Sequence, residues 1–194
     1  MALTILSLAD AKTFLGVTVS TEDTTIEALL YSNEAGMESY CRRYLIDTTV
    51  TEYLDGCGKV YIFLREPARA ITSIYEDGTR TWAAASLVAS SDYQLVTLRN
   101  GTGKRVQYYD SAWSAGQANI RVIYSAGFAS IPTDVIQAAR IQIGRAYAEW
   151  KRTEAGKDAL AENDVAGWSQ TWLAKEGLDP ACKQLLGPYR NYGI

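Results

Sequence analysis

The sequence predicts an α+β protein that is mainly helical, in which an N-terminal helix pair packs with a long helix after residue 132. Apolar residues recur at steps of three and four in these segments, which is typical of helices with one buried face. Between them, at about residues 48–124, the apolar period changes to two, which is typical of strands joined in hairpins. The chain has 194 residues, of which 47% are apolar, so it is long enough to bury a core.

Two helices are expected before the β region. The stretch "SLADAKTFLG", residues 7–16, begins with a serine cap and ends with a glycine, so it predicts a short helix. A longer helix is expected from a cap at Ser20 or Thr21 to the pair Arg42 and Arg43, whose charges suit a helix C-terminus. Its expected buried face consists of Ile26, Leu29, Leu30, Met37, Tyr40, Cys41 and Tyr44.

The β region is expected to consist of short strands separated by turns, because Val, Ile, Tyr and Thr alternate with turn-forming pairs. Asn100-Gly101 is a strong hairpin signal, since both residues tolerate positive φ. The other turns are expected at Asp55-Gly56, Glu66-Pro67 and Asp77-Gly78. The expected strands are "TTVTEYL", "KVYIFL", "AITSIYE", "YQLVTLR", "KRVQYYD" and "ANIRVIYSAGF".

The long helix is expected to begin after Pro132, with Thr133 or Asp134 as its cap. Gly144 within it costs about 1 kcal/mol relative to alanine, which indicates either the close approach of another backbone or simple tolerance. A short helix around "WSQTWLAKE" and an extended, aromatic tail are expected to follow. The expected buried stripe of the long helix is Ile136, Ala139, Ile143, Tyr147 and Trp150.

Composition excludes several functional classes. The chain contains no histidine, so Ser-His-Asp and Cys-His nucleophile systems and His-ligated metal sites are excluded. Its three cysteines, Cys41, Cys57 and Cys182, lie far apart, which argues against a metal site or a disulfide scaffold. The net charge of −3 gives no basic field for nucleic acid. The N-terminus lacks the features of a signal peptide, and no apolar run is long enough for a bilayer, so we expect a cytoplasmic product without a membrane partner.

The remaining candidates for chemistry are weak. Carboxylate pairs can perform acid-base catalysis without histidine, but each pair here falls at an expected turn or a solvated helix end. "NGTGKRV" departs from a phosphate-binding loop, because Leu98 and Arg105 stand where that pattern needs glycine and Ser or Thr. We therefore expect no enzyme, no catalytic residue, no cofactor and no metal. The carboxylate pairs are Glu52 with Asp55, Glu76 with Asp77, and Glu149 with Glu154.

Two groups of residues are candidates for contact with a partner. Arg42 and Arg43 could bind phosphate or an acidic surface, although charge compensation at a helix end also explains them. Large aromatic residues near the C-terminus could equally belong to a core or to a protein interface. These aromatic residues are Trp168, Trp172, Tyr189 and Tyr192.

The order of these motifs carries a family resemblance. The stretches "LSLADAKTFLGV", "ESYCRRYL", "FLREPARAITSIYEDG" and "IRVIYSAGFASIPTDVIQAARIQIGRAYAEW" follow one another between residue 6 and about residue 150. In this arrangement the sequence resembles the head-tail connector (adaptor) proteins of tailed bacteriophages. The most specific part is Tyr-x-Ala-Gly-Phe followed by Pro-x-Asp, and the closing "LLGPYR" also resembles tails in this group.

The resemblance implies a structural protein of the virion neck, made in the host cytoplasm. Such a protein forms a ring under the portal, dodecameric by the resemblance, that extends the DNA channel and carries the stopper or tail. Double-stranded DNA would pass through without sequence-specific binding. It implies a connector-like domain at 1–160, with the β region inserted, and a docking segment at 161–194. The alternatives are a stopper or tail-completion protein of the same neck, a carboxylate-based hydrolase, and a sequence-specific DNA-binding regulator.

The C-terminal tail is the expected contact with the portal, because it is apolar and aromatic. Truncation after Asp179 is then expected to abolish attachment to the portal and to leave the fold intact. The portal-interface candidates are Leu185, Leu186, Pro188, Tyr189 and Arg190, and the other interface candidates are Trp168, Trp172, Arg42 and Arg43.

Overall fold

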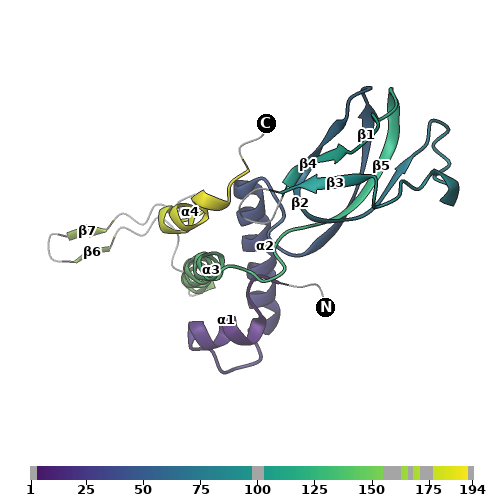
Figure 1. Ribbon diagram of the computed structural model, residues 1–194. Helices are drawn as coiled ribbons and strands as arrows, with labels where there is room; N and C mark the ends of the chain where they lie inside the picture. The colour runs from purple at the N-terminus through teal and green to yellow at the C-terminus, as the bar shows by residue number, and fades with distance from the viewer. Residues whose placement is uncertain (1–3, 98–102, 155–162, 166–167, 171–176, 192–194) are drawn as a thin grey trace. The chain divides into compact units, whose positions relative to one another are not determined.

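The computed structural model describes residues 4–97, 103–154, 163–165, 168–170 and 177–191. The chain forms two compact units, which Figure 1 draws as a group of helices and a group of strands. We call them the helical unit, Met1–Arg42 with Ile131–Ile194, and the β unit, Arg43–Ser130. The two ends of the chain therefore build one unit, and the middle builds the other.

The helical unit is built from helices that bury their apolar faces against one another. Helix α3 contacts α1, α2 and α4, and α2 also contacts α1 and α4. A short pair of strands, β6 (Asn163–Val165) and β7 (Trp168–Gln170), lies between α3 and α4 in the sequence. The helices are α1 (Leu8–Leu15), α2 (Asp23–Cys41), α3 (Thr133–Glu154) and α4 (Pro180–Leu186), followed by the 3-10 turn η2 (Gly187–Tyr189). Their fully buried side chains are Ala11, Ile26, Met37, Cys41, Val135, Ala138, Ile143, Cys182 and Leu186.

The capping residues at the ends of the first two helices test the predicted helix boundaries. The hydroxyl of Ser7 accepts a hydrogen bond from the Asp10 N–H at 3.1 Å, and Gly16 ends α1 at φ 70°, which confirms the predicted short helix. The predicted cap of α2 at Ser20 or Thr21 is wrong, because α2 begins at Asp23 after Glu22. The Glu22 carboxylate makes no cap, since it accepts hydrogen bonds from the Lys151 ammonium and the Tyr147 hydroxyl on α3.

Gly144 on α3 has a packing role. A Cβ atom at this position would lie 3.3 Å from the ring of Phe14 at the end of α1. The glycine therefore accommodates an aromatic side chain, where the sequence had indicated either another backbone or simple tolerance.

The buried carboxylate of Glu34 fixes the N-terminal segment to α2. It accepts a hydrogen bond from the Ile5 N–H at 2.7 Å, and only 7% of Glu34 is exposed. Burial raises the pKa of Glu34, although backbone hydrogen bonds from Ile5 and Leu6 oppose that rise. The site of Glu34 therefore favours the protonated carboxyl group over the ionised one.

The β unit is built around an antiparallel sheet of five strands in the order β1-β5-β2-β4-β3. Strand β5 pairs with β1 on one edge and with β2 on the other, so Ala126 faces both Thr48 and Ala68. In Figure 1, β3 and β4 lie side by side and run at an angle to β1 and β5. The strands are β1 (Thr48–Gly56), β2 (Tyr61–Glu76), β3 (Tyr93–Val96), β4 (Gly103–Tyr108) and β5 (Gly116–Ala126), with a 3-10 turn η1 (Ala84–Ser86).

Strand β2 runs through the position where the sequence predicted a turn. Its first half, from Tyr61 to Ala68, pairs with β4, and its second half, from Ala68 to Glu76, pairs with β5. The predicted turn at Glu66-Pro67 is wrong, because Pro67 is buried within this strand at the change of partner. A proline lacks the N–H that a continuous ladder needs, so it is tolerated at such an irregularity.

The prediction of a mainly helical protein is wrong, because the β region forms one five-stranded sheet. The two strands that flank Asn100-Gly101 do pair as predicted, since β3 pairs with β4. Strands β1 and β2 are also consecutive in the sequence, yet β1 pairs with the last strand of the sheet, β5, at Thr48 with Ala126. The β region is therefore one sheet with its own core and a full unit of the protein. Its core contains Ile62, Leu64, Ala68, Ile74, Val88, Tyr93, Val106, Trp113, Ile120, Val122, Tyr124 and Ala126.

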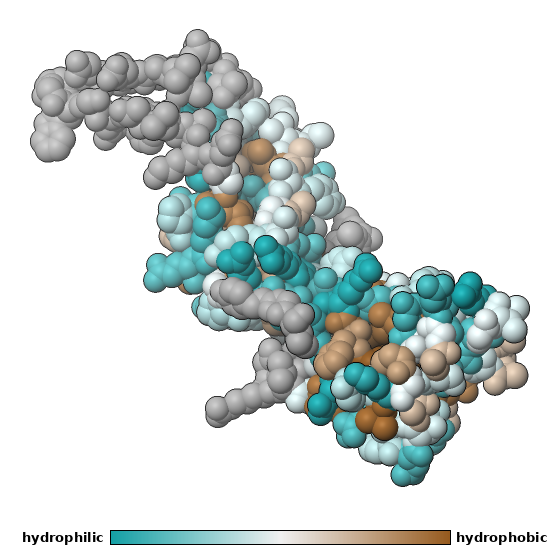
Figure 2. All heavy atoms as spheres, turned by 90° about the horizontal axis from the view of Figure 1, so that it is seen from above, coloured by the Kyte–Doolittle hydropathy of each residue, from teal (hydrophilic) through white to brown (hydrophobic). Residues whose placement is uncertain are grey.

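Several large apolar side chains remain at the surface of the β unit. Figure 2 shows apolar side chains gathered on part of this unit, with hydrophilic residues around them. The exposed large apolar residues of the β unit are Tyr44, Tyr53, Val60, Phe63, Leu87 and Tyr109. In the described part of the chain, no helix has the length and apolar character that crossing a bilayer requires.

We predict that Gly127→Ala strongly destabilises the β unit. A Cβ atom at Gly127 would lie 2.0 Å from the Ile46 carbonyl oxygen, and the residue has φ 82°. The free energy of unfolding should fall by about 3 kcal/mol or more, measured by urea denaturation. The control is Gly58→Ala, where φ is 67° but no atom lies within 4 Å, so only backbone strain of about 1 kcal/mol is expected. Equal losses in the two variants would contradict the steric explanation.

We predict that Glu34→Gln changes the pH dependence of stability. The folded protein binds the Glu34 proton more tightly than the unfolded chain does, so stability falls as pH rises above the usual glutamate value of 4.5. Glutamine keeps the acceptor for Ile5 and cannot ionise. The variant should therefore gain stability relative to the unchanged protein as the pH rises above 4.5, measured by urea denaturation at a series of pH values. Parallel pH profiles would contradict a raised pKa.

Candidate partner interface of the helical unit

The C-terminal segment, residues 177–191, is anchored to α2 and α3. The Asp179 side chain caps α4 by accepting the Ala181 N–H at 2.8 Å, and the Asp179 N–H donates to Gln142 on α3 at 3.0 Å. Farther along, the Asn191 N–H donates to the Cys41 carbonyl at the end of α2 at 2.7 Å. The tail that the sequence predicted as extended is therefore helical and turn-like from residue 180 to residue 189.

The five portal-interface candidates lie together in this segment but differ in exposure. Pro188 is exposed, Leu185 is half-buried, and Leu186 is fully buried beside the core. The Tyr189 hydroxyl donates a hydrogen bond to Asp134 at 3.4 Å. Burial is the main cause that raises the pKa of Tyr189, and the negative charge of Asp134 raises it further. The Arg190 guanidinium lies 5.1 Å from the Tyr40 ring centroid. Leu186 is thus a core residue, and Pro188 is the candidate best placed for direct contact.

The two adjacent arginines have separate structural roles. Arg42 ends α2 in the left-handed conformation at φ 52°, and its carbonyl accepts a hydrogen bond from the Asn191 side chain at 3.1 Å. Arg43 belongs to the β unit, where it is 8% exposed and its guanidinium lies 4.7 Å from the Phe128 ring centroid. Only Arg42 keeps an exposed side chain. Trp168 lies in β7, whereas Trp172 and Tyr192 lie outside the described residues.

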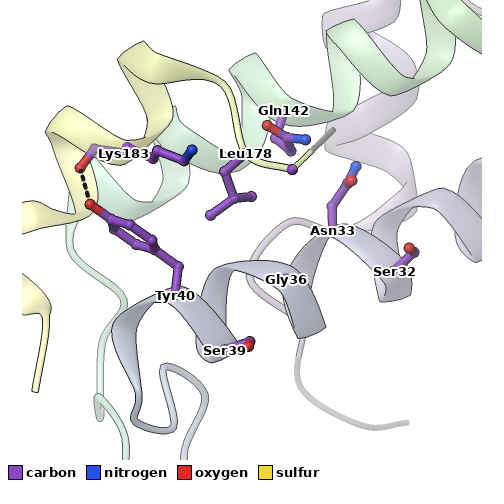
Figure 3. Close-up of a pocket in the computed structure, with 9 residues that line it drawn as sticks. Ser32, Asn33, Gly36, Ser39, Tyr40, Gln142, Leu178 and Lys183 are labelled. Carbon is purple, nitrogen blue, oxygen red and sulfur yellow. Dashed lines mark hydrogen bonds between the residues drawn. The ribbon is translucent and has the colours of Figure 1, made fainter. Parts of the chain in front are cut away.

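A groove of about 460 Å³ lies beside this segment on the helical unit. Figure 3 shows Tyr40 facing Lys183 at one end of the groove and Asn33 with Gln142 at the other, and the Tyr40 hydroxyl donates to the Lys183 carbonyl at 3.4 Å. The sequence interpretation missed this groove, although the small residues of α2 at helical spacing mark it. Its lining residues are Ser32, Asn33, Gly36, Ser39, Tyr40, Gln142, Gly177, Leu178 and Lys183.

The carboxylates of the β unit hold loops and strands. Glu52 is buried and accepts hydrogen bonds from the Tyr124 hydroxyl at 3.2 Å and from the Arg65 N–H. Asp77 accepts hydrogen bonds from the backbone and hydroxyl groups of residues 79–82, and these bonds, chiefly from the Thr79 hydroxyl, hold the pKa of Asp77 well below its usual value. The other paired members are similarly engaged: Asp55 accepts from the Ala118 N–H, and Glu76 accepts from the Ser114 N–H.

Two of the three cysteines, Cys41 and Cys182, are buried, and Cys57 is exposed. Burial raises the pKa of the Cys182 thiol to about 11, so it stays protonated at neutral pH. Among the described residues, no group of three or more acidic or cysteine side chains is placed to hold a metal. Gly103 begins β4, where a Cβ atom would lie 2.2 Å from the Val96 carbonyl oxygen, and the predicted turn before it lies outside the described residues.

Comparisons with known proteins found one family model and several solved structures that match this chain. A family model described as head completion protein matches residues 4–192. The fold is similar to a chain in the neck of an empty GTA particle, computed with C6 symmetry, at TM-score 0.64 and 16% identity, covering 100% of this chain and 96% of that one. It is also similar to a chain in the neck of a native GTA particle, computed with C12 symmetry, at TM-score 0.60 and 15% identity, covering 100% and 97%. None of the curated proteins matches the chain.

We predict that Leu186→Ala destabilises the helical unit by about 2–5 kcal/mol, because it leaves a cavity in the core. Pro188→Ala, two residues away at an exposed position, should change stability by less than about 0.5 kcal/mol. Truncation after Asp179 should accordingly unfold this unit, since it removes both Cys182 and Leu186. Urea denaturation of the variants checks these results, and a tolerated Leu186→Ala or truncation would show that the segment is a detachable tail.

Proposed function

The chain belongs to the head completion protein family, and we propose that its copies form a ring in the neck of a phage-like particle, under the portal. Membership of this family confirms the prediction, made from the sequence, of a structural connector of a phage head. The observation that carries the proposal is the extent of the match, which spans residues 4–192 and so includes both units.

A ring is supported by the symmetric assemblies in which similar folds occur. The two neck structures that resemble this chain were computed with C6 and C12 symmetry. In a closed ring, each subunit presents two different complementary surfaces to its neighbours. We propose a dodecamer on the portal, through which double-stranded DNA passes without sequence-specific binding. Its lower side would carry the stopper or tail.

The proposed role requires no catalysis. The chain has no histidine, and the candidate carboxylates Glu52, Asp55, Glu76 and Asp77 accept hydrogen bonds that hold the β unit together. These groups act as fixed acceptors within the framework. A rigid framework suits a protein whose task is to repeat the same contact around a ring.

The proposed portal contact is the outer side of the α4–η2 segment, centred on Pro188. The segment is held by the Asp179 cap and by Gln142, so its exposed surface is presented in one orientation. Little conformational freedom is lost when such a surface binds, which favours affinity. Repetition of the contact around the ring adds avidity.

We predict that Pro188→Asp weakens attachment to a portal ring without unfolding the protein, because it places a negative charge at an exposed apolar position of the proposed contact. Binding is measured by sedimentation velocity of each variant with the purified portal ring, and folding by urea denaturation. Ala9→Asp, an exposed change on α1, is the matched control and should bind normally. If the protein does not bind the portal ring itself but binds a connector ring already attached to the portal, it is a stopper or tail-completion protein. Normal binding by Pro188→Asp would overturn the proposed contact.

A further inference from the structure

One surface of the β unit gathers basic and aromatic side chains. Phe63 on β2 lies directly opposite Arg105 on β4, so both point to the same side of the sheet. Tyr61 and Arg65 share that side because strand residues two apart point the same way. Lys59 joins them, since its ammonium lies 5.8 Å from the Tyr61 ring centroid. We call these five residues the basic face.

The basic face is open to solvent and carries excess positive charge. Phe63 is 46% exposed and the Arg65 side chain is 88% exposed. The nearest compensating carboxylate, Glu52, lies 3.7 Å from the Arg65 guanidinium but is itself buried. Lys59 and Arg105 have no carboxylate partner among the described residues. A second carboxylate, Asp55, lines a groove with Lys59 and Phe63, and it already accepts a hydrogen bond from the Ala118 N–H.

The helical unit presents a stripe of opposite charge. Helix α2 contains no lysine or arginine and four carboxylates, of which Asp23 pairs with Lys12 and Glu34 is buried, so Glu27 and Glu38 supply the charge of the stripe. Glu27, Tyr31, Ala35 and Glu38 recur at steps of four and three, so they lie along one side of this helix. Tyr31 is 56% exposed, and the small residues Ala28 and Ala35 leave space on either side of it. We call Glu27, Ala28, Tyr31, Ala35 and Glu38 the acidic stripe.

We propose that the basic face of one copy binds the acidic stripe of the next copy. This inference rests on the proposed ring, and it identifies the two complementary surfaces that a head-to-tail contact needs. Each surface has exposed aromatic residues with charges around them, which is the usual composition of a protein interface. The charges are opposite, so they favour this pairing and disfavour pairing of like surfaces.

A second copy fits the basic face better than DNA does. The complementary acidic surface is present on the same chain, and every copy in a ring supplies both. Exposed Phe63 and half-buried Tyr61 offer an apolar area that the phosphates of a duplex cannot cover, whereas Tyr31 between two alanines can. Binding to duplex DNA is therefore the alternative that the experiment must separate.

The test is a charge exchange read out by sedimentation velocity of the full-length protein over a wide concentration range. Lys59→Glu with Arg105→Glu should weaken self-association by about tenfold or more, and Glu27→Lys with Ala35→Lys should do the same. Combining the four substitutions in one chain should restore association, since both surfaces then have reversed charge. The control, Ala9→Glu with Ala89→Glu, adds negative charge at exposed positions outside the basic face and the acidic stripe and should associate normally.

Each outcome bears on the pairing separately from the portal experiment. Loss in each half of the exchange with recovery in the combination supports the proposal. Equal association of all variants overturns it, although the ring itself would stand. A protein that stays monomeric at every concentration also overturns it, and attachment to the portal then decides the proposed function alone. If Lys59→Glu with Arg105→Glu instead loses binding to a short DNA duplex and keeps self-association, the basic face is a DNA contact.

Discussion

The β unit depends on the pairing of β5 with two strands at once. Strands β1 and β2 bind its opposite edges, and Ala126 is opposite a residue in each of them. This double pairing sets the register that sends Ile120, Val122 and Tyr124 into the core. Gly127 follows immediately, where only a residue without a side chain fits against the Ile46 carbonyl. The pairing of β5 and the close packing of Gly127 therefore fix the end of this strand.

The parts of the fold that short-range signals determine could be predicted, and the parts that depend on distant pairing could not. Ser7 and Gly16 define α1 within ten residues, so the sequence was sufficient. The partner of β1 lies beyond three other strands, and Pro67 looked like a turn because nothing nearby reveals a change of partner. Helix α4 was missed although Asp179-Pro180 is a normal helix start, because the aromatic composition of the tail outweighed it.

The residues of the candidate interface could be proposed from the sequence, but their burial could not. The C-terminal segment was identified from its composition, yet composition does not separate buried Leu186 from exposed Pro188. Likewise, the pair Arg42 and Arg43 reads as one basic cluster in the sequence, whereas the structure assigns the two residues to different units. The basic face could not be recognised at all, because its residues come together only when β2 pairs with β4. Which side chains share such a surface depends on the register in which the two strands pair.

The division of the chain between the units has a consequence for synthesis. The β unit is continuous, from Arg43 to Ser130, so a ribosome has released all of its strands before it synthesises α4. The helical unit needs α1 and α2 from the beginning of the chain and α4, with buried Leu186, from its end. The N-terminal helices can pack on α3 once it is synthesised, but the core of this unit stays open until α4 adds the buried side chains of Cys182 and Leu186. The helical unit can therefore offer its finished surface to a partner only after α4 has left the ribosome.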